Sequence, residues 1–152
     1  MRILISGGTG FIGRRIAERF HELGDDVAVI HRGLSEPRDW IPVQHIHGDR
    51  LALRERAKEI NAFRADVVVD ANAMTGADVD AATSVLPDVP TVVLSSQDVY
   101  QAFAAFGAGR CDADVPLTEN GELRRLRYPY AGRGFAGVSD YYEKLDVEDR
   151  WL

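Results

Sequence analysis

The sequence has little of several features that would point to a specialised class of protein. Its only cysteine, Cys111, cannot form an internal disulfide, which favours a reducing, cytoplasmic compartment. No apolar run approaches the ~18 residues that a membrane span needs, and residues 1–6 do not resemble a signal peptide. The formal charge of −6 and the pI near 5.2 argue against nucleic acid or an anionic membrane as a partner.

The length and composition are those of one soluble globular domain over residues 1–152. The chain is 45% hydrophobic and 28% charged, which excludes disordered and fibrous classes. Short apolar runs alternate with segments of helical periodicity, and this order predicts an α/β fold with a doubly wound parallel sheet. The strands are expected at residues 3–5, 27–30, 43–47, 67–69 and 91–94.

A glycine-rich turn follows the first predicted strand and opens the first predicted helix. Gly8, Gly10 and Gly13 match GxGxxG in the context that gives this motif its meaning. Glycines there let a diphosphate approach the main chain, and the helix N-terminus offers it unpaired N–H groups; the alternative is that they only tighten the turn. The predicted cofactor contacts of this turn are Gly7, Gly8, Thr9, Gly10, Phe11, Ile12, Gly13 and Arg14.

The end of the second strand bears on which dinucleotide is bound. NAD sites usually place Asp or Glu there for the ribose 2′-hydroxyl, whereas an arginine accommodates a 2′-phosphate. Here His31 and Arg32 follow the strand, and the next carboxylate is Glu36. Arg14 offers a second cation. We therefore predict NADP rather than NAD, with a solvated loop charge as the alternative for Arg32.

Four segments together resemble the short-chain dehydrogenase/reductase superfamily in its extended or atypical branch. Residues 6–13 are similar to TGxxGxxG, with Gly7, Gly10 and Gly13 as its glycines. Residues 48–50, 71–73 and 95–100 are similar to the segments that follow the third, fourth and fifth strands in this branch.

The resemblance implies a Rossmann domain and assigns roles to further residues. It places Asp49 near the adenine amino group and Ser96 where the superfamily keeps a catalytic Ser or Thr. It also implies that the cofactor contacts include Asp49, Arg50, Ala71, Asn72, Ala73 and Lys144.

The expected catalytic helix, about residues 140–152, departs from the superfamily's Tyr-x-x-x-Lys. Lys144 has Asp140 four residues before it, and Tyr141 three before it. Three interpretations stay open: Tyr141 is the acid/base, Asp140 is a base with a pKa raised by burial, or Asp140 is the helix N-cap. Lys144 remains a ribose contact in all three.

Residues 101–138 lose periodicity and are expected to form an irregular loop on the substrate side. The predicted last helix is unfinished at residue 152, and we expect the chain to be a fragment or shortened form of a larger enzyme. Association into homo-oligomers stays open.

Other candidates have less support. His45-x-His47 places two imidazoles on one face of a strand, but no neighbouring set completes a metal site, so we predict none. Asp98 is a candidate for proton transfer, with a loop or capping role as the alternative. Three arginines near Tyr128 are candidates for gripping an anionic substrate or form a solvated face: Arg124, Arg125 and Arg127.

These observations predict an oxidoreductase or an epimerase/dehydratase of the extended or atypical short-chain type. Its substrate would be a small carbonyl or hydroxyl compound or a nucleotide sugar, with hydride passing to or from NADP(H). The alternative is a non-catalytic NAD(P)-binding module that senses redox state or regulates a partner.

Overall fold

The computed structural model describes residues 1–36, 39–110 and 116–152. Two compact units divide the chain: the first holds Met1–Ala73 and Ala77–Leu94, the second Met74–Gly76 and Ser95–Leu152. Each is described by itself below. Cys111, which we read as an ordinary thiol, lies outside the described residues.

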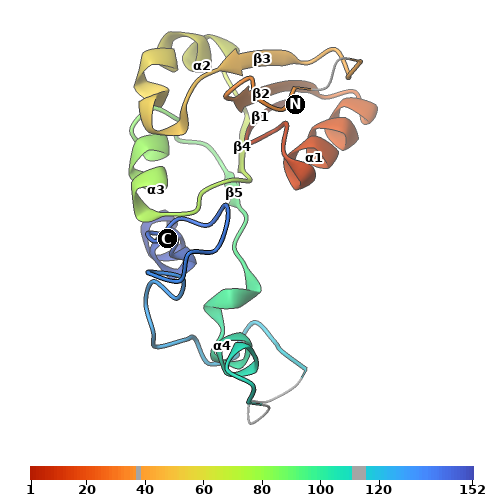
Figure 1. Cartoon of the computed structure of the whole chain (residues 1–152). Helices are drawn as coiled ribbons and strands as arrows, with labels where there is room; N and C mark the ends of the chain where they lie inside the picture. The colour runs from red at the N-terminus through yellow and green to blue at the C-terminus, as the bar shows by residue number, and fades with distance from the viewer. Residues whose placement is uncertain (37–38, 111–115) are drawn as a thin grey trace. The chain divides into compact units, whose positions relative to one another are not determined.

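The first unit is built on a five-stranded sheet in which every pair of neighbouring strands is parallel (Figure 1). The strand order is β3-β2-β1-β4-β5, so the chain winds outward in two directions from β1. This confirms the predicted doubly wound α/β class. The strands are β1 (Arg2–Ser6), β2 (Asp26–His31), β3 (Gln44–His47), β4 (Val67–Asp70) and β5 (Thr91–Val93).

In the first unit, helical segments follow three of the strands, β1, β3 and β4. They are α1 (Phe11–Glu22) after β1, η1 (Arg50–Arg56) and α2 (Ala57–Phe63) after β3, and α3 (Gly76–Thr83) after β4. Among the described residues no helix has the length and apolar composition needed to cross a lipid bilayer.

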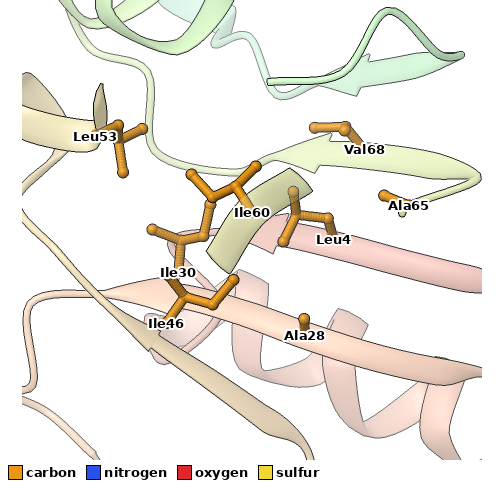
Figure 2. Close-up of a cluster of buried hydrophobic side chains, with 8 residues drawn as sticks. All are labelled: Leu4, Ala28, Ile30, Ile46, Leu53, Ile60, Ala65 and Val68. Carbon is orange, nitrogen blue, oxygen red and sulfur yellow. The ribbon is translucent and has the colours of Figure 1, made fainter. Parts of the chain in front are cut away.

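The sheet carries a hydrophobic core on each face, because successive side chains of a strand point to opposite faces. Leu4 and Ala28 lie on one face with Ile60 of α2 (Figure 2). Ile5 and Val29 lie on the other face and pack with residues of α1. Strands buried on both faces explain the continuously apolar runs in the sequence.

The second unit departs from two expectations. The stretch predicted to be irregular from residue 101 contains α4 (Gln101–Gly107), preceded by a short turn of helix, η2 (Gln97–Val99). The last helix, α5 (Lys144–Trp151), begins four residues later than predicted. Its N-cap is Glu143, whose carboxylate accepts a hydrogen bond from the N–H of Leu145.

Candidate functional site

The turn between β1 and α1 has room only for glycine at three positions. Gly7 has φ of +80°, a conformation that disfavours a side chain, and donates its N–H to the Ile30 carbonyl at 2.9 Å. A Cβ on Gly8 would lie 2.4 Å from Val29, and a Cβ on Gly13 only 2.2 Å from the Gly7 carbonyl oxygen. The local backbone therefore depends on these glycines.

The N-terminus of α1 presents unsatisfied main-chain donors. Gly10 is its N-cap and has no side chain to cap them, and the first turn contains no acidic residue. Phe11 is 92% exposed and the next residue, Ile12, is also exposed. The N–H groups of the first helical turn have no acceptor within the helix, so this end suits an anion.

Arg14 directs its guanidinium along α1. Its Nε donates to Glu18 at 2.8 Å, and the same carboxylate also accepts from Arg15 and from the indole of Trp40. The hydrogen bond from Arg14, with those from Arg15 and Trp40, outweighs desolvation and lowers the pKa of Glu18. Arg14 is thus already paired in this structure, whereas the sequence suggested it as a second cation for the cofactor.

The buried Arg50 side chain forms hydrogen bonds with residues at the carboxyl ends of β1 and β4. Its guanidinium makes two hydrogen bonds to Asp70, at 2.7 and 2.5 Å, and Asp70 is fully buried. The same group donates to Ser6 at 3.0 Å and to the Asn72 side chain at 2.8 Å. Planar, bidentate pairing of this kind fixes orientation as well as charge.

The segment after β4 is held against the glycine turn by this arrangement. The Asn72 side-chain oxygen accepts from both Ser6 and Arg50, and its Cβ is 2.8 Å from where a Gly7 Cβ would lie. The Ala71 N–H donates to the Ser6 carbonyl at 3.0 Å, and Ala73 is fully buried. Arg50, a predicted cofactor contact, donates to Ser6, Asp70 and Asn72 in this structure and so positions the segment around the turn.

A pocket of about 390 Å³ lies at the carboxyl ends of β2 and β3. One oxygen of the exposed Asp49 side chain accepts from the Leu51 N–H at 2.9 Å. The Nε of Arg56 is buried and has no hydrogen-bond partner among the described residues. The other end of the guanidinium pairs with Glu59 at 3.3 Å, so the Nε–H is the donor that remains for an anionic ligand. The pocket is lined by Arg32, Leu34, His47, Gly48, Asp49 and Arg56.

In the second unit a polar cluster forms around Ser96. Ser96 is the N-cap of η2 and accepts from the Asp98 N–H at 3.3 Å. The Tyr142 side chain hydrogen-bonds those of Ser96 and Asp98, and Tyr130 donates to Asp98 at 3.3 Å. Asp98 is buried, and its second carboxylate oxygen has no partner among the described residues.

Tyr142 is held in its protonated form. Burial raises its pKa to about 12, and the neighbouring Asp98 charge acts in the same direction, against the hydrogen bond with Ser96. At neutral pH its hydroxyl is therefore a proton donor rather than a base. Its ring packs edge-on against Tyr130, with centroids 5.3 Å apart.

Residues 140–143 precede α5 and are not part of the helix. Tyr141 is 76% exposed, and Asp140 accepts a hydrogen bond from the Gly132 N–H at 3.2 Å. Asp140 is therefore not the N-cap of the last helix; Glu143 takes that position. Lys144 is buried as the first residue of α5.

The three arginines that we read as a solvated face or an anion grip have different surroundings. Arg124 is buried and pairs with the fully buried Glu143. Arg127 forms ion pairs with Asp146 and Asp149 on α5. Arg125 is exposed and pairs only with its neighbour Glu122 among the described residues. Arg124 thus stabilises the start of α5 from inside the unit.

Sequence reasoning missed two residues that the structure brings to these sites. Tyr142 stands two residues before Lys144, a spacing that does not share a face on a helix, so the sequence does not single it out. Arg56 lies eight residues beyond Gly48, and only the turn through η1 brings its side chain back over that glycine. Neither has a sequence signal that spacing alone would reveal.

Comparison of the sequence with known protein families identifies one match. A family model for the NAD dependent epimerase/dehydratase family matches residues 3–111. None of the curated proteins matches the sequence significantly.

Solved structures share the fold at low sequence identity. UDP-glucose 4-epimerase from Bifidobacterium longum is 16% identical, with a TM-score of 0.72, over 99% of this chain and 48% of that one. A putative epimerase from Burkholderia cenocepacia J2315 is 22% identical, with a TM-score of 0.67, over 99% and 48%. UDP-N-acetylglucosamine 4-epimerase from Bacillus cereus is 18% identical, with a TM-score of 0.61, over 99% and 49%.

The chain therefore spans about half the length of the solved structures it matches. The family model, by contrast, covers well over half of the chain, from β1 through α4, and includes the glycine turn. On these grounds the chain belongs to the NAD dependent epimerase/dehydratase family.

Proposed function

We propose that this protein binds a nicotinamide dinucleotide, with the pyrophosphate at the N-terminus of α1. The observation that carries the proposal is the glycine turn. Gly13 approaches the Gly7 carbonyl so closely that no Cβ fits, while uncapped main-chain donors stand at the helix end. Such a turn accepts a diphosphate against bare backbone. The family membership supports the same cofactor class.

The adenosine end of the cofactor belongs, in this proposal, in the pocket after β2 and β3. Asp49 uses one oxygen to cap η1 and keeps the other for an amino group such as that of adenine. Arg32 and the unpartnered Nε of Arg56 supply positive charge in the same pocket. This charge favours a 2′-phosphate, and hence NADP, although several solved neighbours are described as complexes with NAD.

The chemistry proposed is hydride transfer of the epimerase, dehydratase or oxidoreductase kind. When bound, the nicotinamide supplies the hydride acceptor or donor. Ser96 would hydrogen-bond the reacting oxygen and Tyr142 would hold the mobile proton, since burial keeps its hydroxyl protonated. Lys144 stays a candidate for the ribose contact. Because solved neighbours include UDP-sugar epimerases, nucleotide sugars are the first substrates to test.

Dissociation constants for NADPH and NADH, measured by titration calorimetry, test the cofactor proposal. We expect NADPH to bind more tightly, and Arg32→Ala and Arg56→Ala to reduce the difference. Arg54→Ala is the matched control, because Arg54 lies in η1 but pairs with Ser84 outside the pocket. Equal affinities would refute NADP preference, and flat titrations with both nucleotides would refute dinucleotide binding itself.

Paired tyrosine variants test the chemistry. Conversion of UDP-sugars to their epimers or dehydration products, and oxidation or reduction of NAD(P)(H) with simple carbonyl compounds, should fall about 100-fold or more in Tyr142→Phe, as for loss of a general acid or base. Tyr141→Phe, next to it and exposed, should keep wild-type turnover. Loss of turnover in Tyr141→Phe, with turnover kept in Tyr142→Phe, would instead assign the proton transfer to Tyr141.

A non-catalytic dinucleotide-binding module is the second candidate function. Asp140 occupies the position of the superfamily tyrosine, and it binds a neighbouring loop rather than the Ser96 cluster. Tight dinucleotide binding without turnover by the wild-type chain on any substrate of the panel would favour this function.

A further inference from the structure

Three histidines of the first unit converge at the edge of the sheet. His45 and His47 alternate along β3 and so share one face, and the parallel register pairs His47 with His31 of β2. The rings of His31 and His47 have centroids 4.6 Å apart, and those of His31 and His45 lie 5.0 Å apart.

A carboxylate from the turn after β2 completes the group. One Glu36 oxygen lies 3.0 Å from Nε2 of His47, and the other lies 3.3 Å from Nδ1 of His45. That Nδ1 is in turn 2.8 Å from Nε2 of His31. Each of the four side chains offers one ligand atom, and all four atoms lie within 4.8 Å of one another.

We propose that His31, Glu36, His45 and His47 bind a divalent transition metal ion, with Zn²⁺ as the best match. Three imidazole nitrogens and one carboxylate oxygen form a donor set that Zn²⁺ takes in tetrahedral geometry. Zn–ligand bonds of about 2.0–2.1 Å place tetrahedral ligand atoms about 3.3 Å apart. The spacing between the His31 and His45 nitrogens, 2.8 Å, is already close to this value, as is that between either Glu36 oxygen and its nearest imidazole nitrogen, 3.0 or 3.3 Å.

The surroundings suit a bound ion that enters from solvent. His31 is buried and fixed by β2, whereas Glu36 and His47 are exposed and can adjust. The Trp40 ring packs edge-on against His45.

Without metal, the Gly33 N–H donates to Nδ1 of His31 at 3.0 Å, which leaves the proton on Nε2. Ligation through Nε2 moves that proton to Nδ1 and releases the Gly33 N–H, so the proton count does not change.

The test uses the whole 152-residue chain without a histidine tag. Zn²⁺ affinity is measured by competition with a chromophoric chelator, and stoichiometry by elemental analysis after dialysis. We expect one Zn²⁺ per chain and an affinity loss of at least about tenfold in His47→Ala and in Glu36→Gln. His21→Ala, the one histidine outside the group, should bind as the wild type does.

Two outcomes would overturn the proposal: no Zn²⁺ retained by the wild type, or equal affinity in the wild type and Glu36→Gln. Glu36→Gln replaces an exposed side chain of the same size, so its folding, checked by circular dichroism, separates ligand loss from unfolding. Co²⁺ substitution adds a spectroscopic test, because a tetrahedral site gives intense visible absorption and an octahedral, solvent-held ion does not.

Discussion

At the scale of single residues, Glu143 is a buried carboxylate with several partners in the second unit. It is fully buried, pairs with Arg124, caps α5 through Leu145 and accepts the Tyr128 N–H at 2.6 Å. Removing one partner of a buried ion pair leaves the other charge uncompensated. We expect Glu143→Gln to lower the free energy of unfolding by about 3 kcal/mol.

Urea denaturation measures this effect against a matched control. Glu122 pairs with Arg125 on the surface, with side-chain exposures of 60% and 88%, so Glu122→Gln should cost under about 1 kcal/mol. Similar losses in the two variants would contradict the structural role of Glu143.

The same carboxylate gives a pH dependence. Burial alone would raise the pKa of Glu143, but hydrogen bonds from Arg124, Tyr128 and Leu145 outweigh it and lower the pKa below 4.5. A lowered folded-state pKa contributes stability above the unfolded pKa and loses it as pH falls. The stability difference between wild type and Glu143→Gln should therefore stay constant near neutral pH and shrink below about pH 4.5. A difference that grows on acidification would contradict the assignment.

At the scale of elements, the β1–α1 turn depends on close backbone approach. Gly13→Ala places a methyl group 2.2 Å from the Gly7 carbonyl, so it should displace the turn, lower stability by roughly 2 kcal/mol and abolish nucleotide binding. Gly107→Ala is the control, because among the described residues no atom beyond the adjoining backbone lies within 4 Å of its Cβ position. Denaturation and calorimetry on both variants measure the contrast; unchanged nucleotide binding by a folded Gly13→Ala protein would refute the account of the turn.

The elements of the first unit could be predicted because their signals are local. Strands β1, β2 and β4 are apolar runs that the sheet buries on both faces, and the glycine turn is read from consecutive residues. The second unit gave weaker signals. Helix α4 was not predicted, because a helix is recognised by an apolar face that packs into a core. Its large aromatic residues, Phe103 and Phe106, are exposed and form no such face. Helix α5 was started too early because Asp140 and Tyr141 suggested helical spacing to Lys144.

The site was predictable only where one segment supplies it. Arg50 reaches Asp70 and Ser6, partners 20 and 44 residues away in the chain, and its burial follows from the strand order β2-β1-β4. The histidine group depends on the β2–β3 register and on the turn that returns Glu36. Such contacts are set by tertiary structure, and sequence spacing does not reveal them.

At the scale of the whole molecule, ligand binding should stabilise the folded chain. A ligand that binds only the folded state contributes about 2.7 kcal/mol at 100 times its Kd. For a chain of this size, that is an increase in Tm of roughly 5–10 °C. Differential scanning fluorimetry with NADPH should show it, with adenosine as a control that lacks the pyrophosphate. An unchanged Tm at saturating NADPH would contradict specific binding to the folded protein.

The measurement that bears most directly on the central claim is an amide-resolved NMR titration of ¹⁵N-labelled protein with NADPH. The account predicts that the largest chemical-shift changes fall on the N–H groups of Gly10 to Gly13, because the pyrophosphate accepts hydrogen bonds from the uncapped end of α1. Amide signals there that stay fixed at saturating nucleotide would contradict it.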